Sequence, residues 1–282
     1  MPLFFQQWRG EWLKLFARRR TYLGFAAFLA LELVLLLVFR LQGVGRLFER
    51  LISRQGQVFA DYYSALTLGH MVLGFSVLIL GAIYLALVAG DIVAKEGEDG
   101  HYRLLLARPV SRVRLLGLKY LTCLGYTVVL IQFIAWSAFA FGVAVQGWGG
   151  GFFAMVPELG LIVFHDWDAG LRHYAVASVF LAAAMTTVSS VAFFFSCLPI
   201  KPAAATIGAL SYVLVDMILR NTGFMEDYDH LLLTRHMASW ARLLAEEVPW
   251  AVVLRSYTVL AAVNASLFVL GAAVFTSRDL KS

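Results

Sequence analysis

The chain has 282 residues, of which 61% are hydrophobic and 15% are charged, and its formal net charge is +5. A soluble globular domain has about 45–50% apolar and about 25% charged residues, so this composition excludes a soluble protein and is typical of a membrane protein. Because about 20 apolar residues in a helix cross the hydrocarbon core of a bilayer, the chain has room for roughly six crossings and for no sizeable soluble domain beside them.

The first predicted element is an amphipathic helix that precedes the first apolar stretch. Phe4, Trp8, Trp12, Leu15 and Phe16 recur there at helical spacing, beside basic residues. A helix with this pattern lies in the membrane interface, with its aromatic rings among the lipid headgroups. It is either a simple anchor for the first span or a functional element of its own.

Six apolar stretches are predicted to span the membrane as helices. They cover residues 21–39, 66–90, 120–145, 174–200, 203–219 and 257–276. The fourth and fifth are separated only by the short segment 198–202, whose prolines cannot continue a helix, so these two spans form a helical hairpin. Residues 1–282 are thus predicted to form a single all-α transmembrane domain.

The distribution of Lys and Arg predicts which side of the membrane each end of the chain occupies. With the N-terminus in the cytoplasm, that side carries most of the basic residues, above all the run 18–20 that adjoins the first span. Cytoplasmic loops are enriched in Lys and Arg, so both termini are predicted to be cytoplasmic. The first outer loop, with Arg40, Arg46, Arg50 and Arg54, goes against this pattern.

Three ionisable residues fall inside the predicted spans. They are Glu32, His70 and Asp216. Such residues are costly to bury in hydrocarbon and tend to face the interior of a helix bundle, so the three are predicted to line a substrate path. Glu32 has no partner on its own helix. For Asp216 the alternative is a structural ion pair with Arg220, which follows it by four residues on the same helix face.

Motifs of several other functions are missing from the sequence. Cys123 and Cys197 lie in apolar stretches, and no H-E-x-x-H pattern is present, so we predict neither disulfides nor a metal site nor catalytic residues. His165-Asp166-Trp167-Asp168 is the nearest approach to a metal site, and a solvated outer loop is its simpler interpretation. The chain contains no Gly-Lys pair and therefore no P-loop, so we predict that it binds no nucleotide and is not an enzyme. No basic stripe is interleaved with aromatics, so we expect no nucleic-acid partner.

The most patterned polar segment is the predicted cytoplasmic loop 91–119. Its notable residues are Glu96, Glu98, Gly100, Tyr102, Leu105, Leu106, Pro109 and Arg112. Tyr102, Leu105 and Leu106 would share one face of a short helix, which Pro109 ends, and Ser111 is placed to cap the next helix. This short helix either presents apolar and acidic groups to a cytoplasmic partner or lies flat on the lipid.

The same segment resembles the cytoplasmic loop of ABC-2 type permeases, the membrane subunits of ATP-driven exporters. The shared order is glutamates at 96 and 98, glycine at 100, leucines at 104–106, proline at 109, arginine at 112 and lysine at 119, between the second and third of six spans. The resemblance extends loosely to the six-span layout and the N-terminal helix. His101 departs from the threonine or serine that is usual after the glycine, which puts the cap of the short helix in doubt.

The resemblance implies a coupling helix that docks into a cleft of a separate cytoplasmic ATPase, built from Glu96, Glu98, Gly100, Tyr102, Leu105, Leu106, Pro109 and Arg112. It also implies a transporter made of two permeases, identical or different, and an ATPase dimer that binds ATP and Mg. This transporter would export an unidentified substrate across the inner membrane of a prokaryote. The alternative is an ion-coupled secondary transporter that uses Glu32 and Asp216. That class would show two related halves with interrupted spans, and the sequence shows neither.

Overall fold

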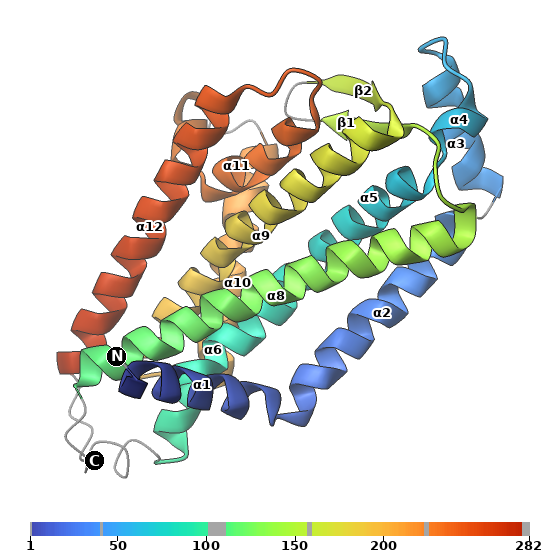
Figure 1. The fold of residues 1–282 in the computed structure, drawn as a ribbon. Helices are drawn as coiled ribbons and strands as arrows, with labels where there is room; N and C mark the ends of the chain where they lie inside the picture. The colour runs from blue at the N-terminus through green and yellow to red at the C-terminus, as the bar shows by residue number, and fades with distance from the viewer. Residues whose placement is uncertain (1, 40–41, 101–110, 157–159, 223–225, 278–282) are drawn as a thin grey trace.

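The computed structural model describes residues 2–39, 42–100, 111–156, 160–222 and 226–277 (Figure 1). Within these residues, six helices are long and apolar enough to cross a membrane. The predicted all-α membrane fold with six spanning helices is thereby confirmed. A short two-stranded sheet is added to the helices at one end of the bundle.

The spanning helices extend beyond the apolar stretches that predicted them. They are α2 (Arg19–Phe39), the continuous α5, η1 and α6 (Ala65–Ser76, Val77–Gly81 and Ala82–Glu98), α8 (Arg112–Gln146), α9 (Trp167–Cys197), α10 (Pro202–Asn221) and α12 (Trp250–Ser277). The second span continues about two turns past residue 90, and the third begins about two turns before residue 120. The backbone hydrogen bonds of a helix are internal, so a helix need not stop where its side chains become polar. Most of the predicted loop 91–119 is therefore helical, and the connection shortens to the segment between Glu98 and Arg112.

The N-terminal helix α1 (Pro2–Phe16) lies across one end of the bundle, beside the start of α8 (Figure 1). We call this the α1 end of the bundle. Thr21 closes the turn between α1 and α2, because its hydroxyl donates a hydrogen bond of 2.6 Å to the carbonyl of Leu15. On α8, a Cβ at Gly125 would lie 2.7 Å from Cζ2 of Trp12. The missing side chain at Gly125 thus lets α1 pack directly on α8.

The opposite end, which we call the hairpin end after the β-hairpin that it carries, holds the connections that follow α2, α8 and α10. Strands β1 (Phe152–Val156) and β2 (Leu161–His165) pair antiparallel, with Phe152 opposite His165. The other connecting elements are α3 (Gln42–Ser53), α4 (Phe59–Tyr62), η3 (Glu226–Leu231), α11 (Leu233–Met237) and η4 (Ala238–Leu244). The β-hairpin formed by β1 and β2 was not predicted. Its strands FFAMV and LIVFH are almost wholly apolar and lack the alternation that identifies a half-buried strand.

Helices α5 and α8 approach each other closely through glycines. A Cβ on Gly142 of α8 would lie 2.4 Å from the carbonyl oxygen of Ala65, and a Cβ on Gly69 of α5 would lie 3.0 Å from Cα of Phe139. In lipid no hydrophobic effect drives helices together, so close contact between backbones is a main source of helix association. The glycines therefore fix the second span against the third.

Gly142→Ala is expected to destabilise the protein by about 1–3 kcal/mol, because the added methyl group meets backbone that cannot rotate away. Gly74→Ala is the matched control: it lies on α5, and a Cβ there would meet nothing within 4 Å. Thermal unfolding in detergent measures both. Equal unfolding temperatures for the two variants would contradict the close approach of α5 and α8.

Candidate functional site

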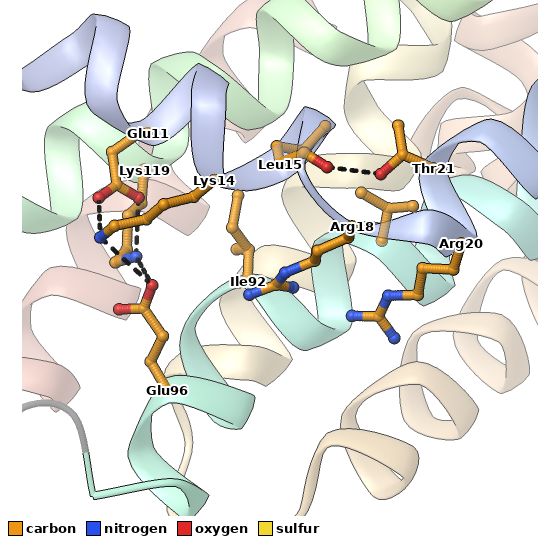
Figure 2. A pocket seen from close by; sticks show the side chains of 10 residues that line it. Glu11, Lys14, Leu15, Arg18, Arg20, Thr21, Ile92, Glu96 and Lys119 are labelled. Carbon is orange, nitrogen blue, oxygen red and sulfur yellow. Dashed lines mark hydrogen bonds and ion pairs between the residues drawn. The ribbon is translucent and has the colours of Figure 1, made fainter.

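Four charged side chains from three helices meet at the α1 end of the bundle (Figure 2). Nζ of Lys119, on α8, lies 2.9 Å from Oε2 of Glu11 on α1 and 2.7 Å from Oε1 of Glu96 on α6. Nζ of Lys14 lies 2.7 Å from Oε1 of Glu11 and 3.8 Å from Oε1 of Glu96. We call these four residues the ionic cluster. It joins α1 to the end of the second span and the start of the third.

The ionic cluster is largely buried, so its charges must be paired to offset the loss of water around them. Only 1% of the Lys119 side chain is exposed, so its ammonium depends on both carboxylates to replace water. Burial by itself raises the pKa of Glu11, but the charge of Lys119 and hydrogen bonds from Lys14 and Lys119 outweigh it and hold that pKa below its ordinary value of 4.5. Burial lowers the pKa of Lys14, but its hydrogen bond to Glu11 and the charges of Glu11 and Glu96 raise it above 10.5. Glu11 and Lys14 are therefore both ionised at neutral pH.

The last turns of α6 are also held by the helices on its other sides. Asp91 forms an ion pair with Arg20 at the start of α2. Oγ of Ser196, near the end of α9, accepts hydrogen bonds from the backbone amides of Val93 and Ala94, over 3.1 Å and 2.9 Å. A Cβ on Gly90 would lie 2.6 Å from Oγ1 of Thr206 on α10, so α10 also packs directly on this part of α6. The end of α6 is thus fixed by five neighbouring helices, including α1 and α8.

The structure separates the two glutamates that were predicted to face a cytoplasmic partner. Glu98, at the end of α6, is exposed. Glu96 is buried in the ionic cluster, where the helix turns its carboxylate inward, toward Lys119, and its role in coupling stays a prediction. Gly100 follows with φ at +71°, a conformation that glycine adopts without strain, and the chain turns out of α6 there.

The remaining predicted coupling residues divide into two sets. Arg112 is the first residue of α8, and its Nη1 donates a hydrogen bond of 3.1 Å to the carbonyl of Thr276, which ties the end of α12 to this site. Ser111 occupies the N-cap position of α8, although its side chain makes no capping hydrogen bond. The others, predicted to form the short cross-helix, lie outside the described residues: Tyr102, Leu105, Leu106 and Pro109. Their role in coupling stays a prediction.

The three predicted residues of the substrate path lie against different elements. Glu32 is fully buried and accepts a hydrogen bond of 2.9 Å from Oγ of Ser137 on α8. His70 packs its ring against those of Phe152 and Trp240. No hydrogen bond or ion pair joins Glu32, His70 and Asp216 to one another within the part of the chain that the structure describes. The structure therefore does not assemble them into one site.

Asp216 fastens α10 to the hairpin end of the bundle. Its carboxylate accepts hydrogen bonds from the backbone amides of Leu233 and Thr234, over 3.1 Å and 2.7 Å. Nη1 of Arg220 donates to the carbonyl of Thr234 over 3.1 Å. The two side chains thus meet at the same turn of the neighbouring α11. A structural role for Asp216, which the sequence left as the alternative, has a specific basis here.

Two histidines at the hairpin end hold η4 in place. Nε2 of His165 lies 2.7 Å from the carbonyl oxygen of Leu244, and Nδ1 of His173 lies 2.7 Å from that of Leu243, with the two imidazole rings stacked at 4.3 Å. Burial lowers the pKa of His165, although its hydrogen bond to Leu244 acts in the opposite direction. Among the described residues, no three His, Cys, Asp or Glu are grouped as metal ligands. His165 is accounted for by this contact.

An apolar cavity that the sequence did not reveal lies toward the hairpin end. It measures about 320 Å³ and is lined by residues of α5, η1, α6, α9, α10, α11 and η4. Met185, Met217 and Met237 supply flexible walls, and Arg220 and Trp240 add polar atoms. Asp216 lies beside it, in a smaller pocket that shares Thr234 and Met237 as lining residues. Its volume is at the lower end of the range for small-molecule sites, about 300–1,000 Å³. Because its walls come from elements far apart in sequence, no local pattern predicts it.

Six spanning helices, with a crosswise helix fixed ionically to the second and third, define a multi-pass helical membrane protein. Residues 9–216 match the family model described as ABC-2 family transporter protein. Because this match covers well over half of the chain, the protein belongs to the ABC-2 family, and it is a permease subunit of an ABC transporter. The match runs from α1 into α10 and includes all four residues of the ionic cluster. No curated protein matches the chain in sequence.

Lys119→Met is expected to lower the free energy of unfolding by about 3–5 kcal/mol, because it removes the buried cation that pairs with both carboxylates and leaves them only the partly exposed Lys14. Adding Glu11→Gln and Glu96→Gln should recover part of this loss, since uncharged side chains are less costly to bury. Lys95→Met is the control, because Lys95 is half-buried on α6 and makes no ion pair among the described residues. Unfolding in detergent would measure all three. A triple variant no more stable than Lys119→Met would show that charge is not the cause.

The contribution of Glu11 is expected to depend on pH. Its folded-state pKa is below the ordinary 4.5, so its stabilising effect is present above that pH and is lost as the pH falls through the folded value. Lys14 behaves oppositely: its pKa is raised above 10.5, so its effect is lost only in strong alkali. Unfolding temperatures of the wild type and Glu11→Gln should differ at pH 7 and converge as the pH falls below 4.5. A constant difference would contradict the pairing of Glu11.

Proposed function

We propose that this permease couples ATP hydrolysis by a separate cytoplasmic ATPase to the export of a substrate across the inner membrane of a prokaryote. Membership of the ABC-2 family supports an association of this chain with an ATP-binding subunit in general. The observation that carries the proposal is the ionic cluster, because it makes the two helices that flank the segment between Glu98 and Arg112 move together with α1. Force applied by a partner to that segment therefore reaches three elements at once.

In this proposal the α1 end of the bundle faces the cytoplasm. The basic run 18–20 lies there, as expected for the cytoplasmic side of a first span. The hydrogen bond from Arg112 to Thr276 brings the end of α12 to the same side as α1, in keeping with an even number of crossings. Both termini are thus proposed to be cytoplasmic, and the hairpin end is the outer side.

Glu96 and Glu98 divide the work of coupling. Glu98 is exposed at the end of α6 and is proposed to contact the ATPase, together with the apolar residues 104–106 that follow it in sequence. Glu96 holds the end of α6 to α8 and α1 and so transmits the displacement. A conformational change requires different contacts in its two states, and closure of an ATPase dimer would supply that difference through Glu98.

The apolar cavity is proposed as part of the substrate path. Its walls include η1 and α9, which continue toward the α1 end through α6 and the Ser196 contact. A displacement of α6 would therefore change the shape of the cavity. Its methionine-rich lining suits an apolar or amphipathic molecule, since methionine adapts to irregular ligands. In this path Asp216 lies close by, whereas Glu32 and His70 do not line the cavity.

Charge reversal at Glu98 tests the coupling. Glu98→Lys combined with Leu105→Asp is expected to reduce recovery of the ATPase with the purified permease at least about tenfold, because like charges and a buried carboxylate oppose docking. ATP hydrolysis by the purified complex should fall in parallel. Glu247→Lys is the control, an exposed carboxylate on the hairpin side of α12.

Recovery is measured after solubilisation in mild detergent, with the ATPase identified by mass spectrometry. If the double variant recovers as much ATPase and hydrolyses ATP as fast as the wild type, the proposed coupling surface is wrong. Equal losses in Glu247→Lys would show that the effect does not come from the segment between α6 and α8.

A further inference from the structure

Arg18 is a cation next to the ionic cluster that does not take part in its ion pairs. It lies in the turn between α1 and α2, and its guanidinium points into a pocket beside Ile92 and Arg20 (Figure 2). The pocket is also lined by the ionic cluster and is bordered by Thr21. Arg18 is half-buried there, in contrast to its exposed neighbour Arg19, which does not line the pocket.

The charges around this pocket do not cancel. Lys119 and Lys14 are paired with the carboxylates of Glu11 and Glu96, and Arg20 is paired with Asp91. Arg18 forms no ion pair with any residue that the structure describes. Seven ionisable side chains therefore leave one positive charge at the mouth of the pocket, which favours an anionic ligand.

The position of the turn indicates where such a ligand comes from. α1 lies across the bundle end with Phe5 and Leu13 about 60% exposed, and α2 begins with Tyr22 and Leu23 equally exposed. Apolar side chains left open on both sides of a basic turn are typical of a segment at the membrane surface, with its arginines at the depth of the lipid headgroups. Arg18 is thus placed where lipid phosphates are.

We propose that Arg18 binds the phosphate of one anionic phospholipid at the mouth of this pocket, with Lys14 and Arg20 beside it. The guanidinium suits this ligand because its planar fork donates two parallel hydrogen bonds to phosphate oxygens. The pocket encloses only about 20 Å³, space for a single water molecule, so the phosphate sits at the mouth and not inside. The bound lipid closes the ionic cluster from solvent. The proposal does not rest on coupling to an ATPase.

The adjacent arginine provides a matched control. Arg18→Gln and Arg19→Gln remove the same charge from the same run, but only Arg18 lines the pocket. The delipidated full chain is titrated with phosphatidylglycerol, and the first bound lipid is followed by native mass spectrometry. Arg18→Gln is expected to weaken its affinity about tenfold, the size of a charge-assisted hydrogen bond, and Arg19→Gln less than about twofold. Arg18→Lys should retain intermediate affinity, and circular dichroism confirms that each variant is folded.

Two further titrations identify the ligand. Phosphatidylcholine, which has no net charge, is expected to bind more weakly to the wild type and equally to all variants. Inorganic phosphate at millimolar concentration is expected not to displace phosphatidylglycerol. Equal weakening by Arg18→Gln and Arg19→Gln would overturn the proposal, since it would mean diffuse attraction to the basic run. Unchanged affinity in Arg18→Gln, or displacement by inorganic phosphate, would overturn it as well.

Discussion

The buried ammonium of Lys119 is the constraint on which the α1 end of this permease depends. With 1% of its side chain exposed, it has given up water and needs two carboxylates in return, one from α1 and one from α6. That requirement sets the position of α1 and the length of α6, because Glu96 reaches Lys119 only if the second span continues as a helix beyond the apolar region. The end of α6 and the start of α8 are positioned together as a result.

The geometry of α6 sets the directions of the two glutamates near its end. Each residue of an α-helix is rotated by about 100° from the one before it. Side chains two positions apart, such as those of Glu96 and Glu98, therefore face nearly opposite directions. One faces the buried lysine and the other faces solvent. The short acidic sequence at the end of α6 thus has one buried member, which pairs with Lys119, and one exposed member. The family assignment gives this division a context, since an ABC-2 permease works with an ATP-binding subunit.

The sequence predicts the spans well, because the free energy of burying apolar residues in lipid depends on composition and length alone. It predicts their ends poorly, since a helix with internal backbone hydrogen bonds can continue past the apolar residues, as α6 and α8 do in their polar turns. Glu11 and Lys119 are separated by 108 residues, and nothing local marks them as partners. The sequence could have predicted that Glu96 and Glu98 face opposite directions, because the angle between them follows from helix geometry once α6 is known to continue to that point. The hairpin and the apolar cavity depend on elements that meet only in the folded chain.

The long separation between Glu11 and Lys119 also orders the assembly of the protein. During synthesis α1 and the first span are made well before Lys119. Until Lys119 has been made, Glu11 lacks its buried partner, and the ion pair that joins α1 to α8 cannot form. The seating of α1 is therefore a late step of biogenesis. An N-terminus that is first in the chain reaches its final place only after the segment between the second and third spans has been built.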